Sequence, residues 1–221
     1  LLIDDLQQAN LRQDTVITIG AFDGVHRGHQ FLIQNLVVRA RETRRQAGVV
    51  TFHPHPAAVL NSRVQIRYLT TPGEKAALME QLSLDFLVIL RFDQALSRMS
   101  AADFLRMLAE HLRVRELWVG PDFALGRNRE GDFTALAEIG AAMGIAVRKV
   151  EPFLLEGQPV SSTRIRALLK EGRTREAAHL LGRYPSVAGE VVHGARRGHV
   201  LGYPTANLEV REERAVPGDG V

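Results

Sequence analysis

Short runs of apolar, mostly β-branched residues alternate with longer amphipathic stretches along the chain, and this alternation limits its fold more than any other feature. Each apolar run is typical of a buried strand, and each amphipathic stretch has the spacing of a helix with one inward face. Strands are predicted at 15–19, 49–52, 86–90, 117–119 and 145–150. Helices are predicted at 28–45, 72–82, 100–112 and 133–143. Strand–helix alternation at this spacing indicates an α/β fold with a mainly parallel sheet covered on both faces.

The pattern changes after Val160. Two further helices are predicted, at 161–169 and 174–181, before a Gly-Arg-Tyr-Pro stretch at 182–185 breaks the helical pattern. The remaining residues hold a short β run and frequent glycines but no helical periodicity. We therefore expect two domains, 1–183 and 184–221, of which the second is too short to form a stable core by itself.

Composition narrows the function classes. The absence of cysteine excludes disulfides, thiolate zinc sites, iron–sulfur clusters and a cysteine nucleophile. The net charge is only +3, and arginines are interleaved with acidic residues, which favours an ordinary solvated surface over a nucleic-acid-binding stripe. No apolar run approaches the roughly 20 residues that a membrane span needs. The first residues resemble neither a signal nor a transit peptide, so we expect a cytoplasmic protein with no membrane or nucleic-acid partner.

The turn after the first predicted strand is the first candidate site. Its glycines, Gly20, Gly24 and Gly28, match neither the dinucleotide-binding fingerprint nor a Walker A loop. The turn nevertheless lies where an α/β sheet binds phosphate, at a helix N-terminus. His26 and His29 are three residues apart and would share one side of the first helical turn. We expect them to bind a polyphosphate; a pair of surface or zinc-ligand histidines is the alternative.

A second candidate is the His-Pro-His-Pro tetrad His53, Pro54, His55 and Pro56, which follows the second strand. Each proline fixes its own φ and restricts the residue before it, so the tetrad is held near extended geometry. Such a loop can hold side-chain rings against a flat ligand. The alternative is a rigid turn whose histidines have no function.

A third candidate opens a later helix with Ser161, Ser162 and Thr163, followed by Arg164 and Arg166. A helix cap accounts for only one of the three hydroxyls. Arginines at the positive end of a helix dipole are unfavourable unless an anion is present, and they can pair with phosphate oxygens. The arrangement therefore predicts an anion site.

Asp122, after the fourth strand, is the fourth candidate and could contact a nucleotide or an ion, or only cap its loop. All four groups fall at the carboxyl ends of predicted strands or at an adjoining helix start. Ligands of parallel sheets bind at this edge, so we expect the four groups to converge.

Together these residues resemble the adenylyltransferase module of the prokaryotic bifunctional riboflavin kinase/FMN adenylyltransferases, also called FAD synthetases. The resemblance covers most of residues 15–182 and implies a Rossmann-like nucleotidylyltransferase domain. It rests on the segments 22–29, 51–56, 69–72, 122–126 and 161–166. The segment 189–207, with its Pro-Thr-Ala-Asn stretch, resembles the start of the riboflavin kinase β-barrel of the same family.

The resemblance implies transfer of AMP from ATP to FMN, giving FAD and pyrophosphate, with Mg²⁺ bridging phosphate oxygens. The implied catalytic residues are His26, His29 and Arg166. The implied ATP-binding residues are Gly20, Phe22, Asp23, Gly24, Gly28, Asp122, Ser161, Ser162 and Thr163. The implied flavin-binding residues are His53, Pro54, His55 and Pro56.

In the kinase-like tail the resemblance implies an ATP and Mg²⁺ site at Gly202, Pro204, Thr205 and Asn207, with Thr205 and Asn207 as metal ligands. The family's catalytic glutamate lies further downstream than residue 221, so we do not expect this chain to phosphorylate riboflavin. The expected small-molecule partners are ATP, FMN and, for a complete kinase module, riboflavin. A different HxGH nucleotidylyltransferase remains an alternative, although such an enzyme has no reason to possess the kinase-like tail. A non-catalytic nucleotide-binding module is the other alternative.

Overall fold

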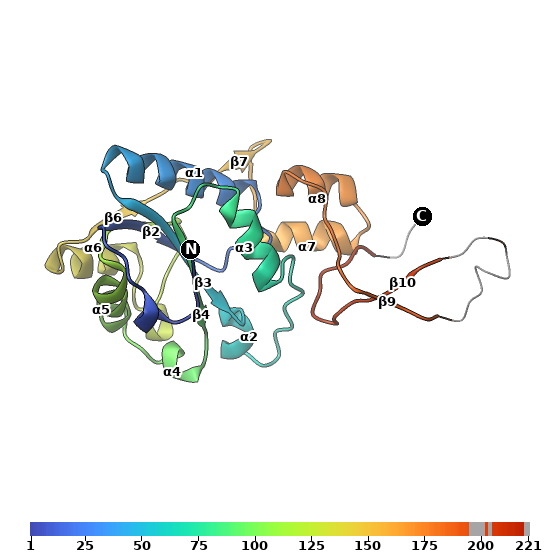
Figure 1. The fold of residues 1–221 in the computed structure, drawn as a ribbon, viewed down its shortest axis with the longest axis horizontal. Helices are drawn as coiled ribbons and strands as arrows, with labels where there is room; N and C mark the ends of the chain where they lie inside the picture. Colours follow the sequence, from blue (N-terminus) through green and yellow to red (C-terminus); the bar gives the residue numbers. More distant parts are fainter. Residues whose placement is uncertain (195–201, 203–204, 219–221) are drawn as a thin grey trace.

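A six-stranded, all-parallel sheet forms the centre of the molecule in the computed structural model, which describes residues 1–194, 202 and 205–218. Figure 1 shows the sheet between two layers of helices. Its strand order is β1-β4-β3-β2-β5-β6, and every neighbouring pair is parallel. The strands are β1 (Leu2–Ile3), β2 (Thr15–Ile19), β3 (Gln46–His53), β4 (Phe86–Arg91), β5 (Val114–Val119) and β6 (Ala146–Lys149). The predicted α/β class is confirmed.

The helices divide between the two faces of the sheet. Alternate strand residues pack against α1 and α3 on one face and against α5 and α6 on the other. Thus Val16 belongs to the core under α1, whereas its neighbour Ile17 belongs to the core under α5 and α6. These four helices are α1 (Arg27–Glu42), α3 (Pro72–Glu80), α5 (Ala101–Leu112) and α6 (Phe133–Ala142). In β3, Gly48 has no side chain because the Phe86 ring occupies the space that a Cβ would need.

Several short elements were not predicted. They are η1 (Leu6–Gln8), α2 (Pro56–Leu60), α4 (Gln94–Ser97), η2 (Arg127–Arg129), β7 (Leu154–Leu155) and β8 (Gln158–Pro159), in addition to the edge strand β1. All of them are too short to show a hydrophobic period. The prediction that the His-Pro-His-Pro tetrad is extended throughout is wrong at its end, because Pro56 is the first residue of α2. Proline fits there because the first residue of a helix has no intrahelical N–H bond to lose.

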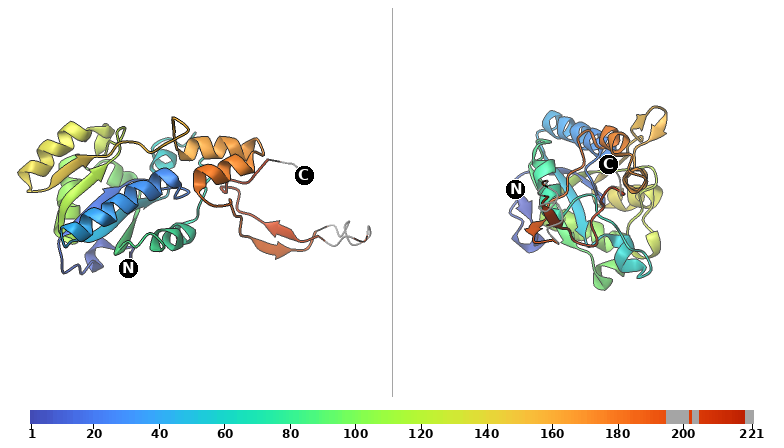
Figure 2. Two further views of the ribbon diagram at one scale, coloured as in Figure 1. Left: turned by 90° about the horizontal axis from the view of Figure 1, so that it is seen from above. Right: turned by 90° about the vertical axis from the view of Figure 1, so that its right-hand side faces the viewer.

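The last two helices, α7 (Ser162–Lys170) and α8 (Thr174–Leu181), form a second small core with each other and with Leu69. Beyond them, β9 (Glu190–Val192) and β10 (Asn207–Glu209) pair antiparallel, and this hairpin projects away from the sheet (Figures 1 and 2). The chain then returns to the domain, where Arg214 forms a β-bridge with Tyr68. The tail is therefore attached to the domain at a point close to α3.

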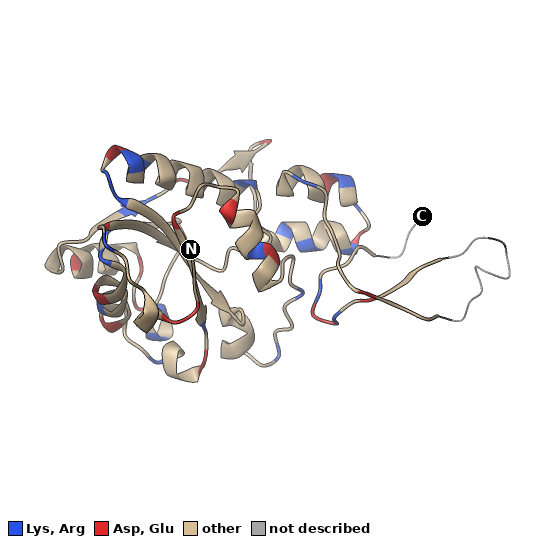
Figure 3. Cartoon of the chain, viewed as in Figure 1, with Lys and Arg blue, Asp and Glu red and all other residues tan. Residues whose placement is uncertain are grey.

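Basic and acidic residues are intermixed on the helices and loops that Figure 3 draws, in line with the interleaving seen in the sequence. Among the described residues, none of the helices has the length and apolar character that a membrane crossing requires.

Candidate active site

A cleft of about 560 Å³ lies at the carboxyl edge of the sheet, and three of the four predicted groups meet in it. Its floor and walls come from the turn before α1, from α2, from the loops after β5 and β6, and from the start of α7. The predicted residues that line it are His26, Gly28, His29, His55, Ser161, Ser162, Thr163 and Arg166. The convergence expected from strand topology is thus observed for these residues.

His26 and His29 are stacked, with ring centroids 3.6 Å apart and ring planes 17° from parallel. The spacing predicted this shared side, but not that His26 would cap α1 by accepting the N–H of His29 on Nδ1 at 3.3 Å. Because that nitrogen is an acceptor, the proton of the neutral His26 ring lies on Nε2. Phe22 packs edge-on against His29 with a centroid distance of 4.9 Å.

Both imidazoles are neutral near pH 7. Burial lowers the pKa of His26 to about 4. Burial also lowers the pKa of His29 well below its ordinary value, and repulsion from a protonated His26 and from Lys75 adds to that effect. Two stacked imidazolium rings would repel each other, whereas neutral rings can each offer an N–H to an anion without that cost. The pair is suited to hydrogen-bond phosphate oxygens rather than to bind them as cations.

Asp23 supports Arg166 and does not line the cleft. It is only 2% exposed, and its carboxylate accepts the N–H groups of Leu69 and Thr70 and the hydroxyl of Thr70. The same carboxylate pairs with Nη2 of Arg166 at 2.6 Å, while Nε of Arg166 donates to the carbonyl of Arg67. These bonds hold the Arg166 side chain at the cleft wall.

The three hydroxyls that open α7 have different partners. Ser161 caps the helix by accepting the N–H of Arg164, as a plain cap would. Ser162 donates to the backbone carbonyl of Asp23 at 2.8 Å, which ties α7 to the turn before α1. Thr163 is exposed at the cleft. The Asp23 carboxylate thus neutralises part of the positive charge of the arginines at the start of α7, so a bound anion is not the only group that can do so.

A separate apolar pocket of about 280 Å³ lies nearby at the same edge of the sheet. Of the predicted residues, Gly20 and Pro56 line it. Four phenylalanines that were not among the predicted site residues also line it, namely Phe52, Phe92, Phe104 and Phe123. Three of these lie at or just after the ends of β3, β4 and β5, and that recurrence was the signal available in the sequence.

The predicted flavin residues are divided by the structure. His55 lines the cleft and caps α2 through Nδ1, and its backbone N–H donates to the Tyr68 hydroxyl at 2.9 Å. Pro56 lines the apolar pocket, whereas His53 and Pro54 line neither cavity. Asp122 is exposed and also lies outside both cavities.

Metal ligands are not clustered in the described part of the chain, where no group of three or more His, Asp or Glu side chains could hold an ion. In the tail, Thr205 and Asn207 are exposed, and Asn207 belongs to β10. Gly202 adopts a positive φ of 80°, and Pro204 lies outside the described residues. The predicted Mg²⁺ site of the tail stays a prediction.

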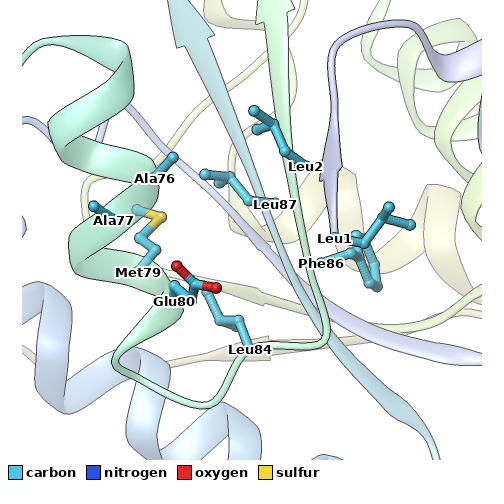
Figure 4. Close-up of a pocket in the computed structure, with 9 residues that line it drawn as sticks. All are labelled: Leu1, Leu2, Ala76, Ala77, Met79, Glu80, Leu84, Phe86 and Leu87. Carbon is cyan, nitrogen blue, oxygen red and sulfur yellow. The ribbon is translucent and has the colours of Figure 1, made fainter.

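Another hollow, of about 310 Å³, lies between α3 and the β1–β4 edge of the sheet (Figure 4). Leu2, Met79 and Leu87 are among the mostly apolar residues around it, and none of the predicted site residues lines it. This hollow is therefore not part of the candidate active site.

A parallel sheet with an HxGH turn at its carboxyl edge, and with hydroxyls and an arginine facing that turn, defines the nucleotidylyltransferase class. Residues 8–164 match the FAD synthetase family, and residues 181–221 match the riboflavin kinase family. The chain belongs to the bifunctional riboflavin kinase/FMN adenylyltransferase family, with a FAD synthetase domain and only part of a riboflavin kinase domain.

Curated relatives of that name agree along nearly the whole chain. The relative from Escherichia coli (strain K12) is 36% identical over 212 residues, which are 96% of this chain and 67% of the relative. The relative from Listeria monocytogenes is 37% identical over 207 residues, covering 93% of this chain and 66% of the relative. The chain thus spans about two thirds of their length.

A crystal structure described as a macrolide-efflux protein from Streptococcus pneumoniae has the same fold, with a TM-score of 0.88 and 28% sequence identity. The match covers all of this chain and 72% of that protein's chain. That description differs from the name that the two curated relatives share, bifunctional riboflavin kinase/FMN adenylyltransferase.

Proposed function

We propose that the cleft binds ATP, that the apolar pocket binds the flavin ring of FMN, and that the chain transfers AMP from ATP to FMN. An oxygen of the FMN phosphate attacks the α-phosphorus of ATP, the bond from that phosphorus to the bridging oxygen breaks, and pyrophosphate leaves. FAD is the other product. The observation that supports this most is the pair of neighbouring cavities at the carboxyl edge of the sheet, one lined by histidines, hydroxyls and Arg166 and the other rich in phenylalanine.

This reaction needs no general base. The second pKa of a phosphate monoester is about 6, so the attacking phosphate is already ionised near neutral pH. The work left to the protein is to align the two phosphates and to stabilise the charge that develops on the leaving group. Preorganised N–H donors and an arginine are the groups suited to that task.

In our proposal, His26 and His29 donate their N–H groups to the triphosphate of ATP. Arg166, held in place by Asp23, faces the departing pyrophosphate together with Ser161 and Thr163. Ser162 acts through the turn, since its hydroxyl is bonded to the Asp23 carbonyl. His55 and Pro56 border the passage between the cavities, where the FMN phosphate would lie.

Mg²⁺ fits this site only as part of the nucleotide. The oxygens of Asp23 already accept several hydrogen bonds, and Asp122 lies outside the cleft. Mg²⁺ at nucleotide sites is commonly held by phosphates and water with few protein ligands. We therefore propose MgATP as the substrate and assign the ion no protein ligand in the adenylyltransferase domain.

The proposal is tested by incubating the protein with FMN, ATP and Mg²⁺ and separating the products by chromatography. FAD and pyrophosphate in equal amounts are expected, and neither should form without FMN. Replacing FMN by phosphopantetheine or nicotinamide mononucleotide tests for a different nucleotidylyltransferase. Turnover of either of these without FAD formation would contradict the proposal, as would nucleotide binding without any turnover.

We keep residues 1–183 and 184–221 as the proposed domains, and propose a cytoplasmic location because ATP is supplied there. Since only part of a riboflavin kinase domain is present, no kinase reaction is proposed for this chain.

A further inference from the structure

Lys75 is a buried cation that is not among the predicted site residues and has no role in the proposed reaction. It is 6% exposed and lies near the N-terminus of α3. No carboxylate of the described residues lies within ion-pair distance of its ammonium group. Burying an unpaired charge is costly, and a cation near the positive end of a helix is also unfavourable. Burial of the charge by itself therefore does not favour a lysine at this position.

The ammonium group is hydrogen-bonded to the turn that follows β2. Its Nζ donates to the backbone carbonyl of Ala21 at 2.6 Å and to the hydroxyl of Thr51 at 3.0 Å, and that hydroxyl donates to the same carbonyl at 2.9 Å. Ala21 lines the apolar pocket, while the ring of the next residue, Phe22, packs on His29 of the cleft. Lys75 thus holds the Gly20–Phe22 segment, a wall of the apolar pocket whose Phe22 ring also packs on His29 of the cleft.

That wall has a backbone conformation that needs support. Phe22 and Val25 have positive φ angles of 47° and 40°, in the left-handed region that is unfavourable for residues other than glycine. Such conformations persist only where surrounding contacts impose them. The bond from Lys75 to Ala21 is the contact directly before Phe22, and the Asp23 carboxylate anchors the residue after it.

The charge of Lys75 also reaches the histidines of both motifs. It contributes to lowering the pKa values of His29, His53 and His55. Asp23 raises the pKa of Lys75, but burial outweighs this effect and lowers that pKa to about 8. The Asp23 carboxylate is itself paired with Nη2 of Arg166 at 2.6 Å.

We propose that Lys75 is a positioning residue for adenylyl transfer, which fixes the Gly20–Phe22 segment through the bonds of its ammonium group to Ala21 and Thr51. This inference rests on the proposed function. Lys75 needs no contact with either substrate, since it acts through the backbone of the turn and through its charge.

Four variants separate the charge from the packing. Lys75→Met keeps the length of the side chain but removes the charge and the donors, and Lys75→Arg keeps the charge. Thr51→Val removes the hydroxyl and leaves the ammonium, while Lys170→Met removes an exposed lysine at the end of α7. We expect Lys75→Met to lower kcat/KM for FMN by about 100-fold. Thr51→Val should have a smaller effect, Lys75→Arg should retain most of the activity, and Lys170→Met should match the wild type.

The pH profile distinguishes this role from a purely structural one. The titratable side chains that Lys75 acts on or responds to are Asp23, His29, His53 and His55, and the pKa values of the three histidines lie below 6.5, so these rings stay neutral between pH 7 and 9. The kcat/KM of the wild type should therefore fall as pH rises through about 8, when the ammonium loses its proton. Lys75→Met should show no fall there, and Lys75→Arg should show it only at higher pH.

Folded Lys75→Met with wild-type kcat/KM would overturn the inference, and so would a slow Lys75→Met that keeps the fall near pH 8. If Lys75→Met does not fold, the pH profile of Lys75→Arg decides, since an unshifted fall would overturn the inference. Absence of FAD with the wild type would overturn the proposed function, and this inference with it. Normal FAD formation by both the wild type and Lys75→Met would overturn the inference about Lys75 and leave the proposed function standing.

Discussion

At the scale of single residues, the neutrality of His26 and His29 is the property from which most of the site's chemistry follows. Burial removes their charge, and stacking then becomes possible at 3.6 Å. One ring caps α1, while Nδ1 of the other is buried without a hydrogen-bond partner among the described residues. A buried polar atom of this kind costs stability unless a ligand or water satisfies it, which favours a binding role for His29.

Removing the His29 ring should slow the reaction more than it weakens substrate binding. We expect His29→Ala to lower kcat by about 10²–10³, the usual effect of losing one preorganised donor to a transition state. Steady-state rates of FAD formation measure this, and a circular-dichroism melt checks that the variant is folded. Near-normal kcat in a folded His29→Ala protein would contradict the role assigned to the ring.

His26 should make the protein sensitive to mild acid. Its pKa is about 4 in the folded protein but near 6.5 when the chain is unfolded, so the unfolded state binds the proton first as pH falls. The stability of the fold is therefore complete above pH 6.5 and decreases between there and pH 4. The loss attributable to His26 is about 3 kcal/mol at most.

Urea unfolding at several pH values measures this effect. In His26→Asn, which keeps a side chain able to cap α1, the dependence on pH in that range should be shallower. An identical pH dependence in the variant and the wild type would show that His26 does not couple folding to protonation.

At the scale of elements, the order of the strands brings together residues that are far apart in the chain. Three of the four phenylalanines of the apolar pocket end or follow β3, β4 and β5, which occupy nearby positions in the sheet, and the fourth, Phe104, belongs to α5. The loops after β5 and β6 and the start of α7 line the neighbouring cleft. Neighbouring loops at one sheet edge thus produce two sites with different chemistry.

Two phenylalanine variants should separate the substrates. Phe123 lines the apolar pocket and Phe31 lines the cleft. Loss of a buried phenyl group costs roughly 1.5–3 kcal/mol of burial, so we expect Phe123→Ala to raise KM for FMN about tenfold or more. Phe31→Ala should affect KM for ATP and leave KM for FMN nearly unchanged. Each variant serves as the control for the other, and equal effects on both substrates would contradict the two-cavity assignment.

At the scale of the whole molecule, the tail contributes to the adenylyltransferase domain. Arg214 is 7% exposed and pairs with both carboxylate oxygens of Glu74, at 3.0 and 2.7 Å, and with the carbonyl of Ser186. Glu74 also completes the capping box of α3. Tyr68 exchanges backbone hydrogen bonds with Glu213 and Ala215, and its hydroxyl accepts the backbone N–H of His55.

We expect Arg214→Met to destabilise the domain by about 1–3 kcal/mol, because Glu74 loses its partner while it remains partly buried. The exposed Arg211→Met is the matched control and should be neutral. Urea denaturation of both proteins, monitored by the fluorescence of Trp118 in β5, measures the difference. Equal unfolding midpoints would show that the tail adds no stability to the domain.

The sequence alone determined the α/β class, the main strands and helices, and most of the polar residues that line the cleft. These follow from local patterns, since hydrophobic period, caps and proline positions act over a few residues. The histidine pair and the hydroxyls before α7 were recognisable for the same reason.

Only the tertiary structure decided which residues become partners across long separations. The Asp23–Arg166 pair joins positions 143 residues apart, and Lys75 reaches Ala21 across 54 residues. The phenylalanine pocket likewise depends on the strand order, which hydrophobic period does not specify. Burial then set the chemistry, because the neutrality of His26 and the lowered pKa of Lys75 result from desolvation by the packed chain, and no local pattern contains that information.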